Sequence, residues 1–119
     1  MKSLTYIISK LDEKIAAYVA ESKKLGLSLD EAFIAKVTKG IGPSIYNADS
    51  ETIAASDPEE LNRVKQNFLI KKLGLKDGPD LDKALEEVIT AIGKSNKNKY
   101  RVLVYALLAK KFKKESVYQ

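Results

Sequence analysis

The chain has 119 residues and a net charge of +5, with 45% hydrophobic and 31% charged residues and neither cysteine nor histidine. This length suits one folded domain, and the composition is that of an ordered globular protein rather than a disordered one. The lack of both residue types excludes disulfides, thiol nucleophiles, histidine-based catalysis and the usual zinc sites.

The first predicted element is a long helix within residues 1–25, at the periphery of the domain. Apolar residues recur there every three or four positions, as on one face of an α-helix: Leu4, Ile8, Leu11, Ile15, Tyr18 and Leu25. Gly26 is expected to end this helix with a positive φ, and Lys23 and Lys24 suit the negative end of its dipole. The stripe predicts packing against the rest of the domain; the alternative is a coiled-coil dimer.

A second helix is predicted before an irregular stretch. Ser28 is expected to cap its N-terminus, with Glu31 completing a capping box. The helix is expected to end where the Gly40–Asp49 loop begins, because two glycines and one proline interrupt the chain there. Asp49 or Ser50 is expected to cap a short turn after the loop. Three apolar side chains are expected to hold the loop against the core: Ile41, Ile45 and Tyr46.

The next two helices follow clear start signals. Asp57 is expected to cap a helix that has Pro58 at its first position and Glu60 as the acid of its capping box. This helix is expected to run to Gly74, where the pattern of apolar residues stops. A further helix is predicted over residues 81–92.

The last predicted element is the most apolar one. Residues 100–109 are apolar except for Arg101, and this run is too short to cross a bilayer. The apolar residues keep helical spacing: Tyr100, Leu103, Val104, Leu107, Leu108 and Phe112. A helix capped by Ser95 or Asn96 is therefore favoured over the alternative, a buried strand, for which no partner strand is predicted. The side chains of residues 117–118 are expected to fold back onto the body.

These elements predict an all-α fold, with residues 1–119 forming a single compact domain. About five short helices are expected to pack around the central apolar C-terminal helix. Residues 94–119 form a basic C-terminal segment, with eight of the 21 basic residues and one of the 16 acidic residues. Pairing with the more acidic body, or simple solvation, is the favoured interpretation, and binding to a polyanion is the alternative.

Three parts of the sequence resemble a known family. They are residues 36–49 (KVTKGIGPSIYNAD), residues 67–75 (NFLIKKLGL), and residues 95–101 (SNKNKYR) together with 114–118 (KESVY). In this order they are similar to domain-of-unknown-function family 2853, a group of small bacterial proteins. The resemblance implies an all-α single domain of packed short helices. It implies no activity, and no catalytic residue can be carried over.

The remaining motifs favour structural interpretations. The two glycines at 40 and 42 do not form a phosphate-binding loop, because a helix precedes them, Pro43 removes an N–H and the third glycine is absent. The acidic clusters at 57–60 and 80–87 fall in the first turns of predicted helices, where they stabilise the helix dipole. No cofactor and no metal ion are expected.

Two polar, irregular stretches are the candidate binding surface. Their residues are Tyr46, Asn47 and Asp49 in the first, and Ser95, Asn96, Lys97, Lys99 and Arg101 in the second. The first hypothesis is a non-catalytic protein that binds another macromolecule, an unknown protein partner, through these surfaces. The alternative is a nucleic-acid-binding protein that uses the basic C-terminal segment. A third hypothesis, an enzyme, requires Tyr46, Asn47 and Asp49 to line one pocket.

Predictions can also be made for the ion pair of Arg101, the oligomeric state and the cellular location. Arg101 is expected to form an ion pair with an acid on a neighbouring helix, such as Glu86 or Asp57. The protein is expected to be a monomer or a weak homodimer. Without an apolar span or a signal-peptide pattern, a cytoplasmic location and no membrane partner are expected.

Overall fold

A computed structural model describes the backbone of residues 2–118 and the side chains of residues 10–118. The elements follow in the order α1 (Lys2–Leu25), α2 (Glu31–Ile41), the 3-10 helix η1 (Gly42–Tyr46), α3 (Ala48–Glu51), α4 (Pro58–Val64), the π-helix η2 (Lys65–Lys72), α5 (Pro79–Ile92), α6 (Arg101–Lys111) and the 3-10 helix η3 (Glu115–Tyr118). Within these residues, β structure is limited to one bridge between Thr52 and Tyr100. The predicted all-α fold is confirmed.

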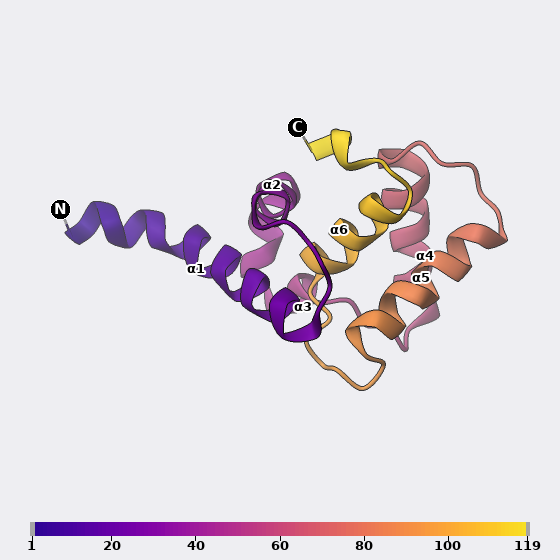
Figure 1. Cartoon of the computed structure of the whole chain (residues 1–119), viewed down its shortest axis with the longest axis horizontal. Helices are drawn as coiled ribbons and strands as arrows, with labels where there is room; N and C mark the ends of the chain where they lie inside the picture. The colour runs from indigo at the N-terminus through magenta and orange to yellow at the C-terminus, as the bar shows by residue number, and fades with distance from the viewer. Residues whose placement is uncertain (1, 119) are drawn as a thin grey trace.

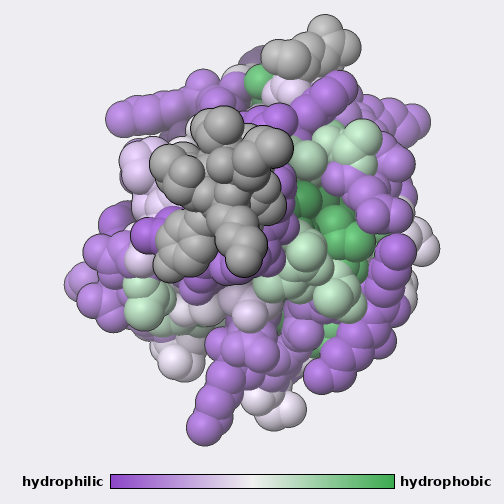
Figure 2. All heavy atoms as spheres, turned by 90° about the vertical axis from the view of Figure 1, so that its left-hand side faces the viewer, coloured by the Kyte–Doolittle hydropathy of each residue, from purple (hydrophilic) through white to green (hydrophobic). Residues whose placement is uncertain are grey.

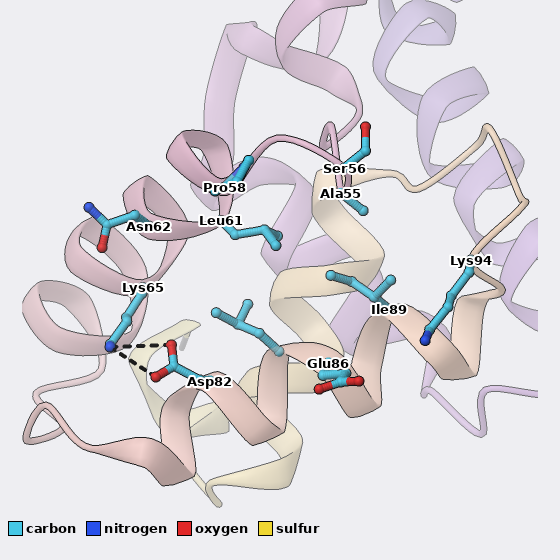
Figure 3. A pocket seen from close by; sticks show the side chains of 11 residues that line it. Ala55, Ser56, Pro58, Leu61, Asn62, Lys65, Asp82, Glu86, Ile89 and Lys94 are labelled. Atoms are coloured by element: carbon cyan, nitrogen blue, oxygen red, sulfur yellow. Dashed lines mark hydrogen bonds and ion pairs between the residues drawn. The ribbon is translucent and has the colours of Figure 1, made fainter.

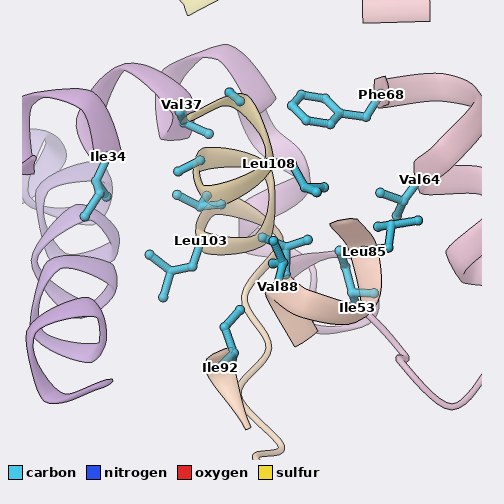
Figure 4. Close-up of a cluster of buried hydrophobic side chains, with 14 of the residues drawn as sticks. Ile34, Val37, Ile53, Val64, Phe68, Leu85, Val88, Ile92, Leu103 and Leu108 are labelled. Atoms are coloured by element: carbon cyan, nitrogen blue, oxygen red, sulfur yellow. The ribbon is translucent and has the colours of Figure 1, made fainter. Parts of the chain in front are cut away.

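Helix α6 lies in the middle of the molecule (Figure 1). It contacts α1, α2, α3, α5 and η3. Six of its residues are buried: Val102, Leu103, Val104, Ala106, Leu108 and Ala109. Figure 4 shows Leu103 and Leu108 leaving α6 on opposite sides, toward side chains from several other elements. A helix that is apolar on all sides is stable only when it is enclosed. The alternative of a strand at this position is wrong.

Helix α1 packs through its C-terminal half and ends as predicted. Tyr18 is fully buried, and Gly26 follows the helix with a φ of +66°. The N-terminal part of α1 extends away from the other helices (Figure 1); the predicted contacts of Leu4 and Ile8 lie outside the described side chains. No helix within residues 2–118 combines the length and the hydropathy needed to cross a membrane.

The start of α2 differs from the prediction. Asp30, not Ser28, caps this helix, and its carboxylate accepts a hydrogen bond from the N–H of Phe33 at 3.3 Å. Ser28 instead has a φ of +56° in the turn that follows α1, so its backbone cannot begin a helix. The capping motif is thus shifted by two residues. The helix also ends one residue later than predicted, with Gly42 at its C-cap and a φ of +82°.

The Gly40–Asp49 segment is more regular than the predicted loop. Residues 42–46 form η1 and residues 48–51 form α3. Asn47 caps α3, because its side chain accepts from the N–H of Asp49, so the prediction of Asp49 or Ser50 as the cap is wrong. Ile45 is buried as expected, whereas Tyr46 is 50% exposed and does not hold the segment to the core.

The helix that starts at Asp57 confirms one expectation and corrects two. Asp57 caps α4 by accepting from the N–H of Glu59, with Pro58 at the first position. Glu60 does not complete a capping box, because its carboxylate binds arginine side chains. The helix is also not a single α-helix, since residues 65–72 form the π-helix η2. A π-helix takes more residues per turn, and this suits the spacing of four and then five between the buried residues Val64, Phe68 and Leu73.

The last two α-helices and the tail follow the prediction in part. Helix α5 ends at Ile92 as expected. Helix α6 begins only at Arg101, and neither Ser95 nor Asn96 caps it. In the tail, Tyr118 is buried, whereas Val117 is 36% exposed, so only one of the two side chains folds back.

We expect the substitution Gly40→Ala to destabilise the protein, against the ordinary helix preference for alanine. A Cβ at Gly40 would lie 2.7 Å from Cε1 and 2.8 Å from Cδ1 of Tyr118, which is closer than van der Waals contact allows. Because the ring of Tyr118 is buried, the tail or α2 must move, and overpacking of this kind costs about 1–3 kcal/mol. Urea denaturation of the variant measures this loss.

The matched control removes the ring. In a Tyr118→Ala background, alanine at position 40 meets no ring and should stabilise the helix by up to about 1 kcal/mol. The sign of the effect therefore reverses between the two backgrounds. A stabilising effect of Gly40→Ala in the wild-type protein would contradict this packing.

Candidate binding surface

The two polar stretches singled out in the sequence meet in the folded chain. The N–H of Ile53 donates to the carbonyl of Lys99 at 2.9 Å, next to the bridge between Thr52 and Tyr100. This short pairing holds α3 beside the loop that precedes α6. A hollow of about 430 Å³ opens there, and its lining includes four of the predicted site residues: Asp49, Asn96, Lys97 and Lys99.

A second and larger hollow adjoins the first. It is an apolar groove of about 540 Å³ between α4 and α5. Leu61 and Ile89 point into it from opposite sides (Figure 3). Ala55, Ser56 and Lys94 line both hollows. We call the two hollows together the trough.

Charged side chains form the rim of the apolar groove. Lys65 bridges to Asp82 at 3.2 Å and to Asp77 at 2.9 Å. Hydrogen bonds from Lys65 hold the pKa of Asp77 below its usual range. Glu86 and Lys94 lie farther along the rim, and Lys94 points toward the groove from the segment after α5 (Figure 3). The groove thus combines an apolar floor with a rim of both signs of charge.

The loop between α5 and α6 is folded by its own polar side chains. Asn96 accepts from the N–H of Asn98 at 2.9 Å and donates to the carboxylate of Glu21 at 3.1 Å. Lys99 is 6% exposed, and its ammonium donates to the carbonyls of Lys94 and Asn96. These two predicted site residues therefore shape the loop. Ser95 and Lys97 remain exposed on it.

Arg101 is held by three groups inside the fold. Its guanidinium donates to the carbonyl of Ser50 at 2.7 Å, to the hydroxyl of Tyr105 at 3.1 Å and to the carboxylate of Glu60 at 2.8 Å. Arg63 donates to the other oxygen of the same carboxylate at 2.7 Å. Burial opposes ionisation of Glu60, but the two arginines outweigh it and hold its pKa below the usual range. This network joins α3, α4 and α6.

The expected ion pair of Arg101 is therefore present with a different partner. Neither Glu86 nor Asp57 binds it, because Asp57 is occupied as the cap of α4 and Glu86 lies on the rim of the groove. Glu60 is the acid that faces α6. The sequence places Glu60 one turn into a helix, but it does not show which side of that helix faces α6.

The remaining predicted residues do not form one pocket. Tyr46 lines a different hollow, together with residues of α1 that include Lys10, Lys14 and Ala17. Asn47 is engaged as the cap of α3, while Asp49 faces the trough. The enzyme hypothesis required these three side chains to line one pocket, and the structure does not bring them together in one. Among the side chains that the structure describes, no three acidic residues gather closely enough to hold a metal ion.

A polar cluster that the sequence analysis missed fixes α3 to α1. Glu51 accepts from the ammonium of Lys14 at 2.8 Å and from the hydroxyl of Tyr18 at 2.6 Å. The ring of Tyr100 lies 4.8 Å from that of Tyr18. Burial, reinforced by the bond to Glu51, raises the pKa of the Tyr18 hydroxyl far above its usual value. A tyrosine within an apolar stripe was the available signal, since a buried hydroxyl needs a partner.

The sequence comparisons identify the family of the chain. The profile of DUF2853, described as a protein of unknown function, matches residues 16–116. No curated protein is similar enough to count as a match. The resemblance seen in the sequence is confirmed, and because the match spans most of the chain, the chain belongs to the DUF2853 family.

Proposed function

We propose that this protein acts by binding a segment of a partner protein in the trough, and not by catalysis. The observation that carries this proposal is the meeting of the two polar stretches beside an apolar groove, with Ala55, Ser56 and Lys94 shared between the hollows. Concave sites with apolar floors and a few polar groups are the usual places for specific binding.

The lining indicates what kind of segment would fit. Leu61, Leu85 and Ile89 offer an apolar floor that suits aliphatic or aromatic side chains. At the other end, Lys94 and Lys97 are exposed, and neither forms an ion pair within the described side chains. Asp49 is the acidic residue that lines this end. We therefore infer an amphipathic segment that places apolar residues between α4 and α5 and acidic residues at the loop.

The proposal also includes a cellular location and an oligomeric state. A chain without cysteine gains nothing from an oxidising compartment, so the cytoplasm remains the proposed location. The proposal needs one copy of the chain, because a single copy already forms both hollows. A monomer that binds one partner segment is the simplest form of this proposal.

Photo-crosslinking in extracts of the cells that produce the protein tests the proposal. A photoreactive benzoylphenylalanine replaces Ser56, which lines both hollows, or Asn62, which lines the groove; both are exposed. We expect both positions to give a covalent adduct with the same partner protein. Asn67, exposed on η2 and outside the trough, is the control and should give none.

A charge-reversal variant provides a second test of the proposal. Reversal of Lys94 and Lys97 to glutamate should lower the yield of the adduct about tenfold, because acidic groups of the partner then meet like charges. Reversal of Lys24 and Lys83, which are exposed elsewhere, changes the net charge equally and should leave the yield unchanged. Equal losses in both variants, or an adduct at Asn67, would contradict a partner in the trough.

A further inference from the structure

A second surface, independent of the trough, gathers lysines around the C-terminal turn. Six lysines from three parts of the chain form it: Lys36 and Lys39 of α2, Lys71 and Lys72 of η2, and Lys113 and Lys114 before η3. Figure 1 shows α2, η3 and the end of η2 along the same upper edge of the molecule. Figure 2, in which the α1 side of the molecule faces the viewer, shows many hydrophilic side chains around the upper part of that face. We call these six residues the lysine face.

Contacts of Tyr118 join the three parts. The ammonium of Lys72 lies 5.0 Å from the centre of the Tyr118 ring. Gly40 lies against the same ring, and Phe33 meets it edge to face at 6.1 Å. Lys36 lies between Phe33 and Gly40 in the sequence of α2, at spacings that place the three residues on one side of the helix. Tyr118 of η3 thus contacts both α2 and η2, two of the elements that carry these lysines.

The charges of this face are not balanced by ion pairs among the side chains that the structure describes. Within the described side chains, ion pairs engage Lys14, Lys23, Lys65 and Lys111, but none of the six lysines of the face. Five of the six are exposed, and Lys114 is half-buried. Glu115 is the acidic residue in the adjoining η3. One acid beside six lysines leaves most of their mutual repulsion uncompensated, so this arrangement favours an external anion.

We propose that the lysine face binds duplex nucleic acid through the phosphate backbone. Lysine ammonium groups act as point charges toward phosphates and carry no base recognition by themselves. Protein interfaces, in contrast, are poor in lysine and rely on aromatic and arginine anchors. Single strands require exposed aromatic rings for base stacking, and Tyr118 is only 6% exposed. Binding is therefore independent of sequence and sensitive to salt.

This surface differs from the one predicted in the basic C-terminal segment. Lys99 and Arg101, expected to contact phosphates, bind carbonyl and carboxylate groups of the fold instead. Lys111 is paired with Glu87 at 3.2 Å. Only Lys113 and Lys114 belong both to that segment and to the lysine face. The other four lysines come from parts of the chain that are distant in sequence.

Fluorescence anisotropy with a labelled duplex of mixed sequence tests the proposal. With about four phosphates neutralised, the affinity should fall about 100-fold as salt rises from about 50 to about 200 mM. The triple variant Lys36→Gln, Lys72→Gln, Lys114→Gln should lower the dependence of log K on log salt by about three. Glutamine resembles lysine in helix propensity, so the fold should be retained, as circular dichroism can verify.

A control variant with the same net charge distinguishes an effect of the lysine face from an effect of the overall charge. Lys10, Lys24 and Lys83 are exposed on α1 and α5, and their replacement by glutamine also removes three positive charges from the total of +5. This variant should bind the duplex within about twofold of the wild type. Equal losses in both triple variants, no binding at low salt, or binding only to vesicles rich in phosphatidylserine would each overturn the proposal.

Discussion

Truncation of Leu103 to alanine is expected to lower the free energy of unfolding by about 3–5 kcal/mol. Leu103 is completely buried near the N-terminal end of α6, which contacts α1, α2, α3 and α5. The loss therefore includes both the transfer of the missing methyl groups and the cavity left behind. Urea denaturation monitored by circular dichroism measures it.

Leu107 on the same helix provides the control. Its side chain is only partly buried, beside a surface hollow that it shares with Leu27 and Val88. The substitution Leu107→Ala should cost about 1–2 kcal/mol, because part of its surface is already in contact with water. Helix propensity changes equally in both variants, so their difference reports burial alone. Equal and small losses at both positions would contradict a central, enclosed α6.

Removal of the Arg101 side chain has the second largest expected effect. The side chains of Arg101 and Glu60 are only 17% and 14% exposed, so their ion pair is shielded from water. Arg101→Ala also removes the hydrogen bonds to Ser50 and Tyr105, and we expect a loss of about 2–3 kcal/mol. Arg63→Ala is the control: Arg63 is exposed at the same carboxylate, and its loss should be small. Unchanged thermal stability of Arg101→Ala would show that Arg101 has no structural role.

The same network predicts a dependence of stability on pH. Because the pKa of Glu60 is lower in the folded protein than the unfolded value near 4.3, its contribution is fully present above that pH. The contribution is lost as the pH falls through the folded pKa. The difference in stability between wild type and Glu60→Gln should therefore be constant around neutral pH and narrow below about pH 4. A difference that grows in acid would contradict this assignment.

The positions of the longer helices could be predicted because local patterns determine them. The stripe within residues 1–25, the cap at Asp57 and the apolar run of α6 each depend on neighbours within a turn or two. The π-helix η2 could not be predicted from local patterns, and its Phe68 stacks on Tyr105, a residue distant in sequence, with ring centres 3.9 Å apart. The predicted start of α2 was wrong because Ser28 and Asp30 are both residues that favour the N-cap position. The turn after Gly26, in which Ser28 has a φ of +56°, leaves Asp30 as the cap.

The candidate site was predictable as two stretches but not as one surface. Asp49 and Lys97 stood out as polar residues in irregular segments, yet their shared hollow depends on the pairing of Ile53 with Lys99. The apolar groove between α4 and α5 left no signal, because Leu61 has the spacing of an ordinary core residue. Sequence alone also could not distinguish the lysines that bind groups of the fold from those that remain exposed.

The most direct test of the proposed function is a map of the surface that the partner covers. Backbone amide chemical shifts of the isotope-labelled protein are recorded before and after addition of the partner recovered by crosslinking. We expect the largest changes along the trough, in residues 53–65 and 82–97, and none around Tyr118. Changes confined to the lysine face, or spread evenly over the molecule, would contradict a binding site in the trough.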